Sequence, residues 1–379
     1  MRPLSPMKPH GASKFLTAVS ELLFRRGDDP TICPSPQEGR TEAKYAFDAL
    51  AEAEDAELAD LLALASSNHV IVRALGRLEK RMAAAGNDRV SQWAASAIED
   101  ERRRIDHALP FLDSICGALE HGGCEVVVIK SLDHWPDLGS DLDLYTDADA
   151  DNVVAIMRQR FGARLEPRSW GDRLANKWNF VVPDLPELVE VHVGRLGQTG
   201  EQIAIAGSLT ARSREVEMGA HVFRVPSLED RLLISTLQRM YRHFYIRLCD
   251  VADTAQVLES DGIHYPRLRT LARSGGLWEG LSTYLCIVSD YVKWYGGTQI
   301  SLPSAVTRAA RFGSDQVSFN RNFLRIPILP HSVSLYATEL KRLMLNGELR
   351  NTLRLSLLPC LATAAALEFK ITGSDKGIW

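Results

Sequence analysis

Excess positive charge, closely spaced cysteines and long apolar runs are all scarce in this sequence. Its 379 residues carry 44 Lys and Arg against 48 Asp and Glu, which gives a formal net charge of −4. Without a long basic run, the chain lacks the electrostatic signature of a general nucleic-acid-binding protein. The cysteines are scattered with no short paired spacing, which argues against a zinc module or a disulfide framework and favours a reducing compartment. They are Cys33, Cys116, Cys124, Cys249, Cys286 and Cys360.

The apolar segments also fail to predict a membrane protein. The N-terminal sequence "MRPLSPMKPHGASKFL" contains no apolar core of signal-peptide length. The most apolar late segment, "LRLSLLPCLATAAALEF", is shorter than a membrane span, contains Pro359 and is flanked by charges. We therefore expect a soluble, cytoplasmic protein.

Changes in hydrophobic period divide the chain into four regions. Residues 1–42 contain prolines and glycines with little periodicity, which predicts a loose arm. Residues 43–122 show helical spacing that ends at a glycine pair, and Pro110 within them is expected to kink the last helix or to mark its start. Residues 123–226 predict a compact mixed sheet, and residues 227–379 are mostly helical again. The predicted fold class is α+β, a small mixed sheet between two helical regions.

Four short segments within the third region read as strands. "CEVVVIK" is a β-branched run of the kind found in buried strands, whereas "DLDLYT", "NKWNFVV" and "LVEVHV" alternate between polar and apolar residues. "DADNVVAIMRQRF" predicts a helix between the second and third of these strands, with acids in its first turn and arginines in its last. After Val225-Pro226, Ser227 and Asp230 predict the start of a single long helix, "LEDRLLISTLQRMYRHFYIRLCDVADTAQVLES".

Aspartates are unusually dense around the first two strands. Asp147, Asp149 and Asp151 have the alternate spacing of a calcium loop, but Asn152 stands where such a loop needs glycine. Arg158 also occupies the position of its final glutamate. We therefore exclude calcium and expect these acids to begin a helix.

Asp141 and Asp143 form the more informative pair. They lie at i and i+2, on one face of the predicted strand, close enough to hold a divalent cation between them. Alone, such a pair is more often a solvated strand face. Glu190 on a later strand adds a third acid, and the turn at Lys130-Ser131, with a helix N-terminus expected after it, is suited to hold phosphates. Three converging carboxylates are the set required for metal-dependent phosphoryl or nucleotidyl transfer.

These elements resemble the core of the polymerase-β-like nucleotidyltransferase superfamily. More narrowly, "VVVIKS", "SDLDLY", "VEVHVG" and "RMYRHFYIRLCDVADTAQVLE" look like a poorly characterised bacterial nucleotidyltransferase family. That family shows an apolar strand ending in Lys-Gly, an Asp-x-Asp strand, an Asp-x-His strand and a long helix with a His and an Asp. The resemblance covers residues 100–260 or so.

The resemblance implies roles for individual residues. Mg²⁺ or Mn²⁺ would be held by Asp141, Asp143 and Glu190, the last in place of the family's usual aspartate. Lys130 matches the family's lysine, whereas Ser131 replaces its glycine, although the wider superfamily has a serine there. The remaining matches to the family's His, His and Asp are His192, His243 and Asp250.

Other side chains are weaker candidates. Lys177, Arg239 and Arg242 are expected to contact a nucleoside triphosphate, with Arg195 a less favoured candidate. The stripe formed by Arg239, His243, Arg247 and Asp250 is by itself more typical of a solvated helix face. Core packing is the expected role of Trp170 and Trp178. Three residues of the loop after Lys130 are expected to be solvated: Asp133, His134 and Asp137.

The predicted reaction transfers a nucleoside monophosphate from an NTP to a hydroxyl acceptor and releases pyrophosphate. One alternative is a non-catalytic relative that keeps the fold as a binding or regulatory module. A less favoured alternative is a glycosyltransferase that uses Asp-x-Asp to hold a nucleotide-sugar. The nucleotide, the oligomeric state and the acceptor stay open. A metabolite, an antibiotic, a protein side chain and an RNA end all fit the three acids.

Overall fold

A five-stranded sheet lies between helices from both ends of the chain. The computed structural model describes residues 15–25, 49–320 and 322–360. The sheet has the order β1 (Val127–Val128), β2 (Asp141–Thr146), β5 (Leu188–Val193), β4 (Lys177–Val181) and β3 (Arg164–Leu165). Strands β2 and β5 are parallel and the other neighbouring pairs are antiparallel, which confirms the predicted mixed sheet.

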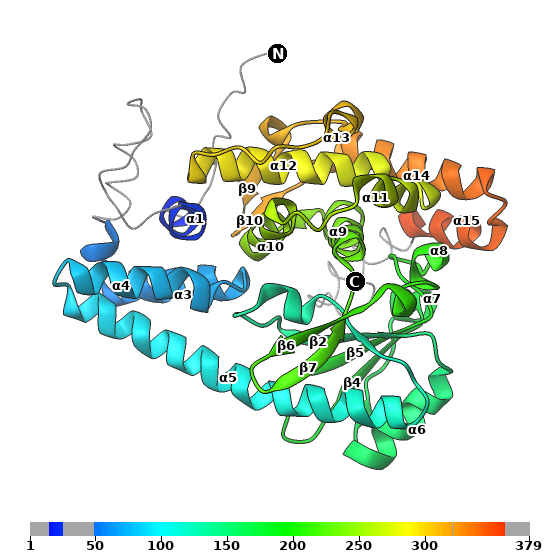
Figure 1. Cartoon of the computed structure of the whole chain (residues 1–379), viewed down its shortest axis with the longest axis horizontal. Helices are drawn as coiled ribbons and strands as arrows, with labels where there is room; N and C mark the ends of the chain where they lie inside the picture. The colour runs from blue at the N-terminus through cyan, green and yellow to red at the C-terminus, as the bar shows by residue number, and fades with distance from the viewer. Residues whose placement is uncertain (1–14, 26–48, 321, 361–379) are drawn as a thin grey trace.

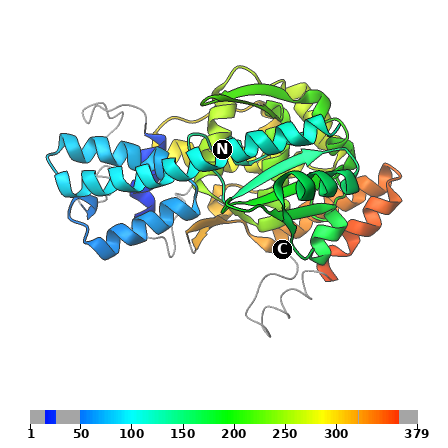
Figure 2. The same ribbon diagram turned by 90° about the horizontal axis from the view of Figure 1, so that it is seen from below.

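The helices before the sheet form one region, joined to it by a long helix. Helix α5 runs from the N-terminal helices to the sheet, where it packs on α6 (Ala150–Phe161) and β7 (His221–Val225) (Figure 1). Figure 2 shows the N-terminal helices on one side of the molecule and the sheet on the other. The N-terminal helices are α1 (Leu16–Phe24), α3 (Asp55–Ser67), the π-helix η1 (Ile71–Leu75) and α4 (Gly76–Ala84), and the long helix that connects them to the sheet is α5 (Asp88–His121).

Two expectations for this region are wrong. Helix α1 lies within the segment predicted to be a loose arm, yet it packs against α12 (Trp278–Gly296) with Leu16, Val19 and Leu22 buried. The Ser20 hydroxyl lies 2.7 Å from that of Tyr291. The alternative that Pro110 marks the start of the last helix is also wrong, because α5 is a helix on both sides of Pro110 and begins more than twenty residues before it. Its end before Gly122 agrees with the sequence.

Short elements connect the sheet strands. The helix predicted after β2 is α6, and Asp149 caps it by accepting a hydrogen bond from the backbone N–H of Asp151 at 2.7 Å. The other connections are η2 (Ser131–His134), α7 (Trp170–Ala175), α8 (Ile203–Ala206), η3 (Thr210–Arg212) and the hairpin of β6 (Arg214–Met218) with β7. The hairpin and β3 are not among the predicted strands.

The single long helix predicted after Ser227 is broken into two. Ser227 does cap α9 (Leu228–Thr236), which continues as the π-helix η4 (Leu237–His243). Phe244 then adopts a left-handed conformation with φ 55°, and β8 (Tyr245–Ile246) pairs with β10 (Phe323–Arg325) before α10 (Leu248–Glu259) begins. A helical period in the sequence does not reveal this break, because the strand partner lies about eighty residues away.

The remaining described residues are mostly helical, and two of their helices end at the glycine pairs Gly275-Gly276 and Gly296-Gly297. Their other elements are α11 (Tyr265–Ser274), α13 (Ser304–Ala309), η5 (Ser314–Gln316), β9 (Ser318–Asn320), η6 (Ile328–Ser332), α14 (Val333–Leu345) and α15 (Leu349–Ser356). Among the described residues, no helix combines the length and apolar character needed to cross a membrane. The five cysteines that the structure describes are all unpaired, and Cys33 lies outside these residues.

Candidate functional site

The register of the sheet brings the predicted site residues onto one face. Asp143 on β2 lies opposite Glu190 on β5, which in turn lies opposite Asn179 on β4. His192 is the partner of Lys177 in the same ladder. The alternate residues form the other face, where Leu142, Leu144, Val189 and Val191 are fully buried. The sequence alternation therefore predicted both faces correctly.

A cavity of about 330 Å³ opens on this polar face. The helical segment after β7 forms its opposite wall through η4, and Tyr245 and Arg247 extend that wall. All eight residues predicted to bind metal or nucleotide line this one cavity: Lys130, Ser131, Asp141, Asp143, Lys177, Glu190, Arg239 and Arg242. His69, Asn179 and His243 also line it. The eight predicted residues alone span 112 positions of the sequence, from Lys130 to Arg242, and tertiary packing gathers them at one cavity.

The turn at Lys130 has a strained backbone. Lys130 has φ 64° and ψ −58°, and the N–H of Ser131 donates to the carbonyl of Ile129 at 2.6 Å. These features define a γ-turn of the rare, strained type, and such strain persists only where surrounding contacts fix it. Ser131 supplies those contacts, since its hydroxyl donates to the Asp141 carbonyl at 2.9 Å and accepts from the Asp143 N–H at 2.7 Å. Ser131 therefore fastens the turn to the strand that carries both aspartates.

The helix N-terminus expected beside this turn is only the four-residue 3₁₀ segment η2. A segment of one turn has too few aligned peptide groups to act as a helix dipole for a phosphate. An anion bound near this turn would therefore be held by the basic side chains of the cavity, Lys130 among them, and not by a helix dipole. The expectation that a helix N-terminus beside this turn would help to hold a phosphate is therefore wrong.

Two lysines and a histidine surround Glu190. Lys177 Nζ lies 2.7 Å from Glu190 Oε2, and His192 Nε2 lies 2.7 Å from Glu190 Oε1. Lys130 contacts both Asp143 and Glu190 through its ammonium group. Burial opposes ionisation of Glu190, but Lys130, Lys177 and the hydrogen bond from His192 outweigh it and hold its pKa well below the usual range. Glu190 is therefore ionised at neutral pH.

The pKa of Asp141 is shifted in the opposite direction to that of Glu190. Its carboxylate forms no hydrogen bond or ion pair with any described residue, although it lines the cavity. Burial and the nearby charges of Asp143 and Glu190 raise its pKa to about 6. A bound cation would relieve this repulsion, which is the electrostatic condition expected of a carboxylate at a metal site.

The ligand atoms of Asp143, Glu190 and His192 all lie within 4.8 Å of one another, which is compact enough to hold one metal ion. This set contains two of the three predicted ligands and adds His192, while Asp141 lies at the same cavity outside the compact set. Carboxylate oxygens suit Mg²⁺ and Mn²⁺, and the imidazole nitrogen is more typical of Mn²⁺ or Zn²⁺. The donor set therefore fits a divalent cation.

The opposite wall of the cavity is basic and largely buried. Arg239 is only 3% exposed, and its guanidinium lies 2.7 Å from the carboxylate of buried Asp250. Arg242 forms no ion pair within the described chain, so its charge is available to the cavity. Burial and the neighbouring arginines hold the pKa of His243 well below its usual range, so its imidazole is neutral. The interpretation of this stripe as a solvated helix face is wrong.

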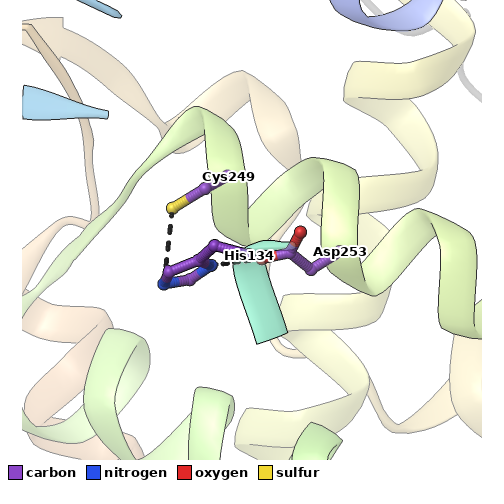
Figure 3. A group of neighbouring side chains, drawn as sticks. All are labelled: His134, Cys249 and Asp253. Atoms are coloured by element: carbon purple, nitrogen blue, oxygen red, sulfur yellow. Dashed lines mark hydrogen bonds and ion pairs between the residues drawn. The ribbon is translucent and has the colours of Figure 1, made fainter. Parts of the chain in front are cut away.

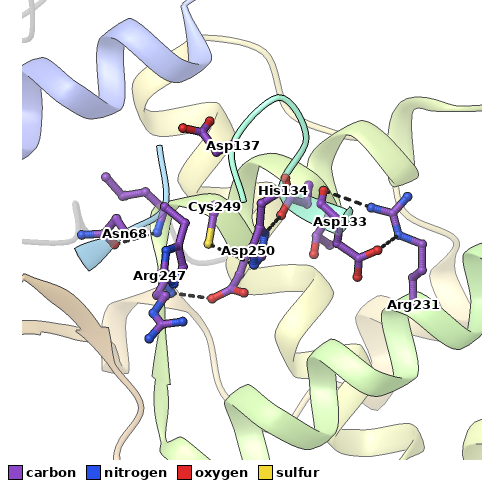
Figure 4. Close-up of polar contacts among 12 residues, drawn as sticks. Asn68, Asp133, His134, Asp137, Arg231, Arg247, Cys249 and Asp250 are labelled. Carbon is purple, nitrogen blue, oxygen red and sulfur yellow. Dashed lines mark hydrogen bonds and ion pairs between the residues drawn. The ribbon is translucent and has the colours of Figure 1, made fainter. Parts of the chain in front are cut away.

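The loop after Lys130 is buried, which contradicts its predicted solvation. Asp133 pairs with Arg231 at 2.7 Å, and Asp137 accepts from the Val72 N–H at 2.7 Å and from Arg73 Nε at 2.9 Å. Figure 4 shows these loop side chains directed into the surrounding helices. The loop is thus held at both ends by buried charges from the two helical regions.

His134 occupies the middle of the loop and contacts α10. Its Nδ1 lies 2.5 Å from Asp253 Oδ2, and its Nε2 lies 3.9 Å from Cys249 Sγ (Figure 3). These three side chains are close enough to hold a metal ion. However, the second oxygen of Asp253 already accepts from Arg73 at 2.6 Å, so its carboxylate is neutralised within the protein. The cluster is better explained as an anchor for the loop.

The remaining candidates lie outside the cavity. Trp170 is 66% exposed and does not pack in the core as expected, whereas Trp178 is partly buried beneath the guanidinium of Arg168 at 3.9 Å. Arg195 donates to the Gly200 carbonyl at 3.0 Å. The sequence did not identify His69 as a cavity residue, because it belongs to the helical region about sixty positions before Lys130 and carries no motif.

Comparison of the chain with protein-family models finds no match, and comparison with curated proteins finds none either.

Proposed function

We propose that this protein transfers a nucleoside monophosphate from an NTP to a hydroxyl group and releases pyrophosphate. The observation that supports the proposal is the composition of one cavity. Three carboxylates, two lysines and the arginines of η4 line it, and Asp141 has no partner among the described residues. Acids paired with cations across a cleft of this size suit a metal-bound triphosphate.

Each side of the cavity has a role in this reaction. Asp141, Asp143 and Glu190 would hold Mg²⁺ or Mn²⁺, which supplies positive charge to the triphosphate when bound. Lys130 and Lys177 would exchange part of their contact with the acids for contact with phosphate oxygens. Arg242 and Arg239 on the facing wall would bind the outer phosphates.

The chemical step forms a bond between the acceptor oxygen and the α-phosphorus. The bond from the α-phosphorus to the oxygen that bridges it to the β-phosphorus breaks, and pyrophosphate leaves with that electron pair. Glu190 orients the hydroxyl, and the released proton passes to the Glu190–His192 pair, in which the two side chains are already hydrogen-bonded.

Calorimetric titration tests the nucleotide site. Mg-ATP, Mg-GTP, Mg-CTP and Mg-UTP are titrated into the wild type and into the Asp141→Asn/Asp143→Asn variant. The proposal expects binding of at least one NTP that requires both the metal and the two acids. A folded wild type that binds none of the four would contradict it. The Asp151→Asn variant, altered at an exposed acid of α6, is the matched control.

One observation favours a second candidate, the non-catalytic relative. Lys130 contacts Asp143 and Glu190 together, and a lysine in that position can substitute for a cation. A binding module would then hold the NTP without metal and without turnover. ATP titration in EDTA distinguishes the two, because the enzyme should lose most of its affinity there and the binding module should not.

The glycosyltransferase alternative receives less support. That class requires a nucleotide-binding βαβ unit before the Asp-x-Asp strand. The described residues before β1 form only helices, including α3, α4 and α5.

A further inference from the structure

A second cavity adjoins the first. It has a volume of about 480 Å³, and Arg242 and His243 line both cavities. It lies where η4 meets the C-terminal helices η6, α14 and α15. A molecule held in the second cavity would therefore approach the carboxylates past these two shared residues.

The walls of the second cavity are mainly apolar. Phe244 lies beside the shared residues, and Tyr336 comes from α14. Further aliphatic side chains complete the walls: Ile328, Val333, Leu355 and Leu358. Cavities of this volume and character typically bind small organic molecules that carry a few polar groups.

The polar end of the cavity is a buried carboxyl pair. Glu339 on α14 and Glu201 are each 1% exposed. Gln202 Nε2 donates a hydrogen bond to Glu339 Oε1 at 2.5 Å. The backbone N–H of Thr199 donates to Glu201 Oε2 at 2.8 Å. Burial and the proximity of Glu201 raise the pKa of Glu339 well above its usual range. The neutral form of Glu339 is therefore favoured as long as no cation lies beside it.

Gln198 adds unused hydrogen-bonding capacity. Its side-chain amide nitrogen and oxygen are both buried, and neither forms a hydrogen bond with a described residue. Buried polar atoms without partners are costly and are rare in folded proteins. Since Gln198 lines the cavity, a bound molecule can supply the missing partners.

We propose that the second cavity binds the hydroxyl acceptor, and that this acceptor is an amine with an apolar or aromatic body. The amine would pair with Glu339, the apolar body would contact Phe244 and Tyr336, and the hydroxyl would extend past His243 toward Asp143. This inference rests on the proposed nucleotidyl transfer for the role of the hydroxyl. The preference for an amine depends only on the second cavity.

Charge selects among the classes of ligand. A protonated amine would allow Glu339 to ionise and would gain a buried charge-assisted hydrogen bond. A carboxylate or phosphate would be buried beside two acids, neither of which pairs with a positive group of the described chain that could balance its charge, and is disfavoured for that reason. A neutral molecule of the same shape would gain only the apolar contacts.

Three matched phenols test this selection: tyramine, 4-ethylphenol and 3-(4-hydroxyphenyl)propionate. Ligand-observed NMR titration at pH 7 measures the affinity of each for the full chain. We expect tyramine to bind at least about tenfold more tightly than 4-ethylphenol, and the propionate to bind weakest. In Glu339→Gln, which keeps the volume and a polar group, the preference for tyramine should disappear. Equal affinity of the three ligands, or an unchanged preference in this variant, would overturn the inference.

A filling variant tests the cavity without altering the buried acids. Val333 is 47% exposed and lines the cavity, so Val333→Trp should block tyramine while the protein folds. Leu329 is 76% exposed nearby but does not line it, and Leu329→Trp should leave tyramine binding unchanged. Loss of binding in both variants, or in neither, contradicts the assigned location.

Mg-ATP titration of the same proteins separates the two proposals. The wild type, Glu339→Gln and Val333→Trp should bind Mg-ATP equally. Selective tyramine binding without Mg-ATP binding would contradict the proposed nucleotidyl transfer and, with it, the acceptor role, while the amine site would stand. Mg-ATP binding without selection among the phenols would contradict the amine site alone.

Discussion

Lys177 on β4 and Glu190 on β5 form a buried ion pair of 2.7 Å at the centre of the carboxylate cluster. Lys177 also contacts Asp172 at 3.2 Å, which links the cluster to α7. The pair has two consequences. Together with Lys130, it holds the pKa of Glu190 well below its usual range, and under the proposed function it would provide a cation that moves to a phosphate when a metal takes its place beside the acid.

Lys177→Met should destabilise the protein. The substitution keeps an apolar stem but leaves Glu190 buried with one fewer cation, and breaking a buried pair from one side costs about 3 kcal/mol or more. Urea denaturation at pH 7 measures the loss. The Lys177→Met/Glu190→Gln variant should recover part of it, because the uncompensated charge is then removed. Strict additivity of the two single effects would show that the residues do not interact.

Asp141→Asn should stabilise the protein at neutral pH when no divalent cation is present. The pKa of Asp141 is raised to about 6 in the folded chain, from an ordinary value of 3.8, so the folded state holds this proton more tightly than the unfolded state. Its neutral form therefore contributes stability that is fully present below about pH 4 and is lost as the pH rises through about 6.

Thermal or urea unfolding across this range measures the effect. The difference between variant and wild type should be near zero at about pH 4 and reach on the order of 1 kcal/mol at pH 7, after allowance for the partial exposure of the group. A variant that is less stable than the wild type at pH 7 would indicate that Asp141 has a structural partner.

Asp137→Ala should destabilise the fold by about 3–5 kcal/mol, because it removes the acceptor of two backbone N–H groups and leaves Arg73 partly uncompensated. Chemical denaturation checks this value. Asp151→Ala, at an exposed position of α6, should change stability by less than about 0.5 kcal/mol. A small effect at Asp137 would mean that the loop after Lys130 is held in some other way.

Ser131→Ala should weaken Mg-NTP binding by about tenfold without abolishing folding. The hydroxyl bridges the strained turn to β2, and each lost hydrogen bond costs roughly 1 kcal/mol. Calorimetry measures the affinity, and Ser140→Ala, at an exposed serine on the same cavity, is the control. If Ser131→Ala binds Mg-NTP as well as the wild type, the turn does not position the nucleotide.

The sequence predicted the strands of the site well because their alternation is local. "DLDLYT" and "LVEVHV" correspond to β2 and β5 with the same bounds, and their polar residues share a face as expected. The sequence did not predict the helix break at Phe244 or the burial of the loop from Asp133 to Asp137. The break at Phe244 accompanies pairing with β10, and the burial of the loop depends on Arg73 and Asp253, which are distant in the sequence.

The sequence by itself determined the strands that carry the acids and the side of the sheet on which the acids lie, since both follow from the period of side chains along a strand. Only the tertiary structure decided that η4 closes a basic wall over these acids, that His192 joins Asp143 and Glu190, and that Asp141 is left without a described partner. The second cavity, too, is evident only from the tertiary structure. These features depend on contacts between segments far apart in the chain, and neither helical nor strand periodicity encodes which of those segments meet.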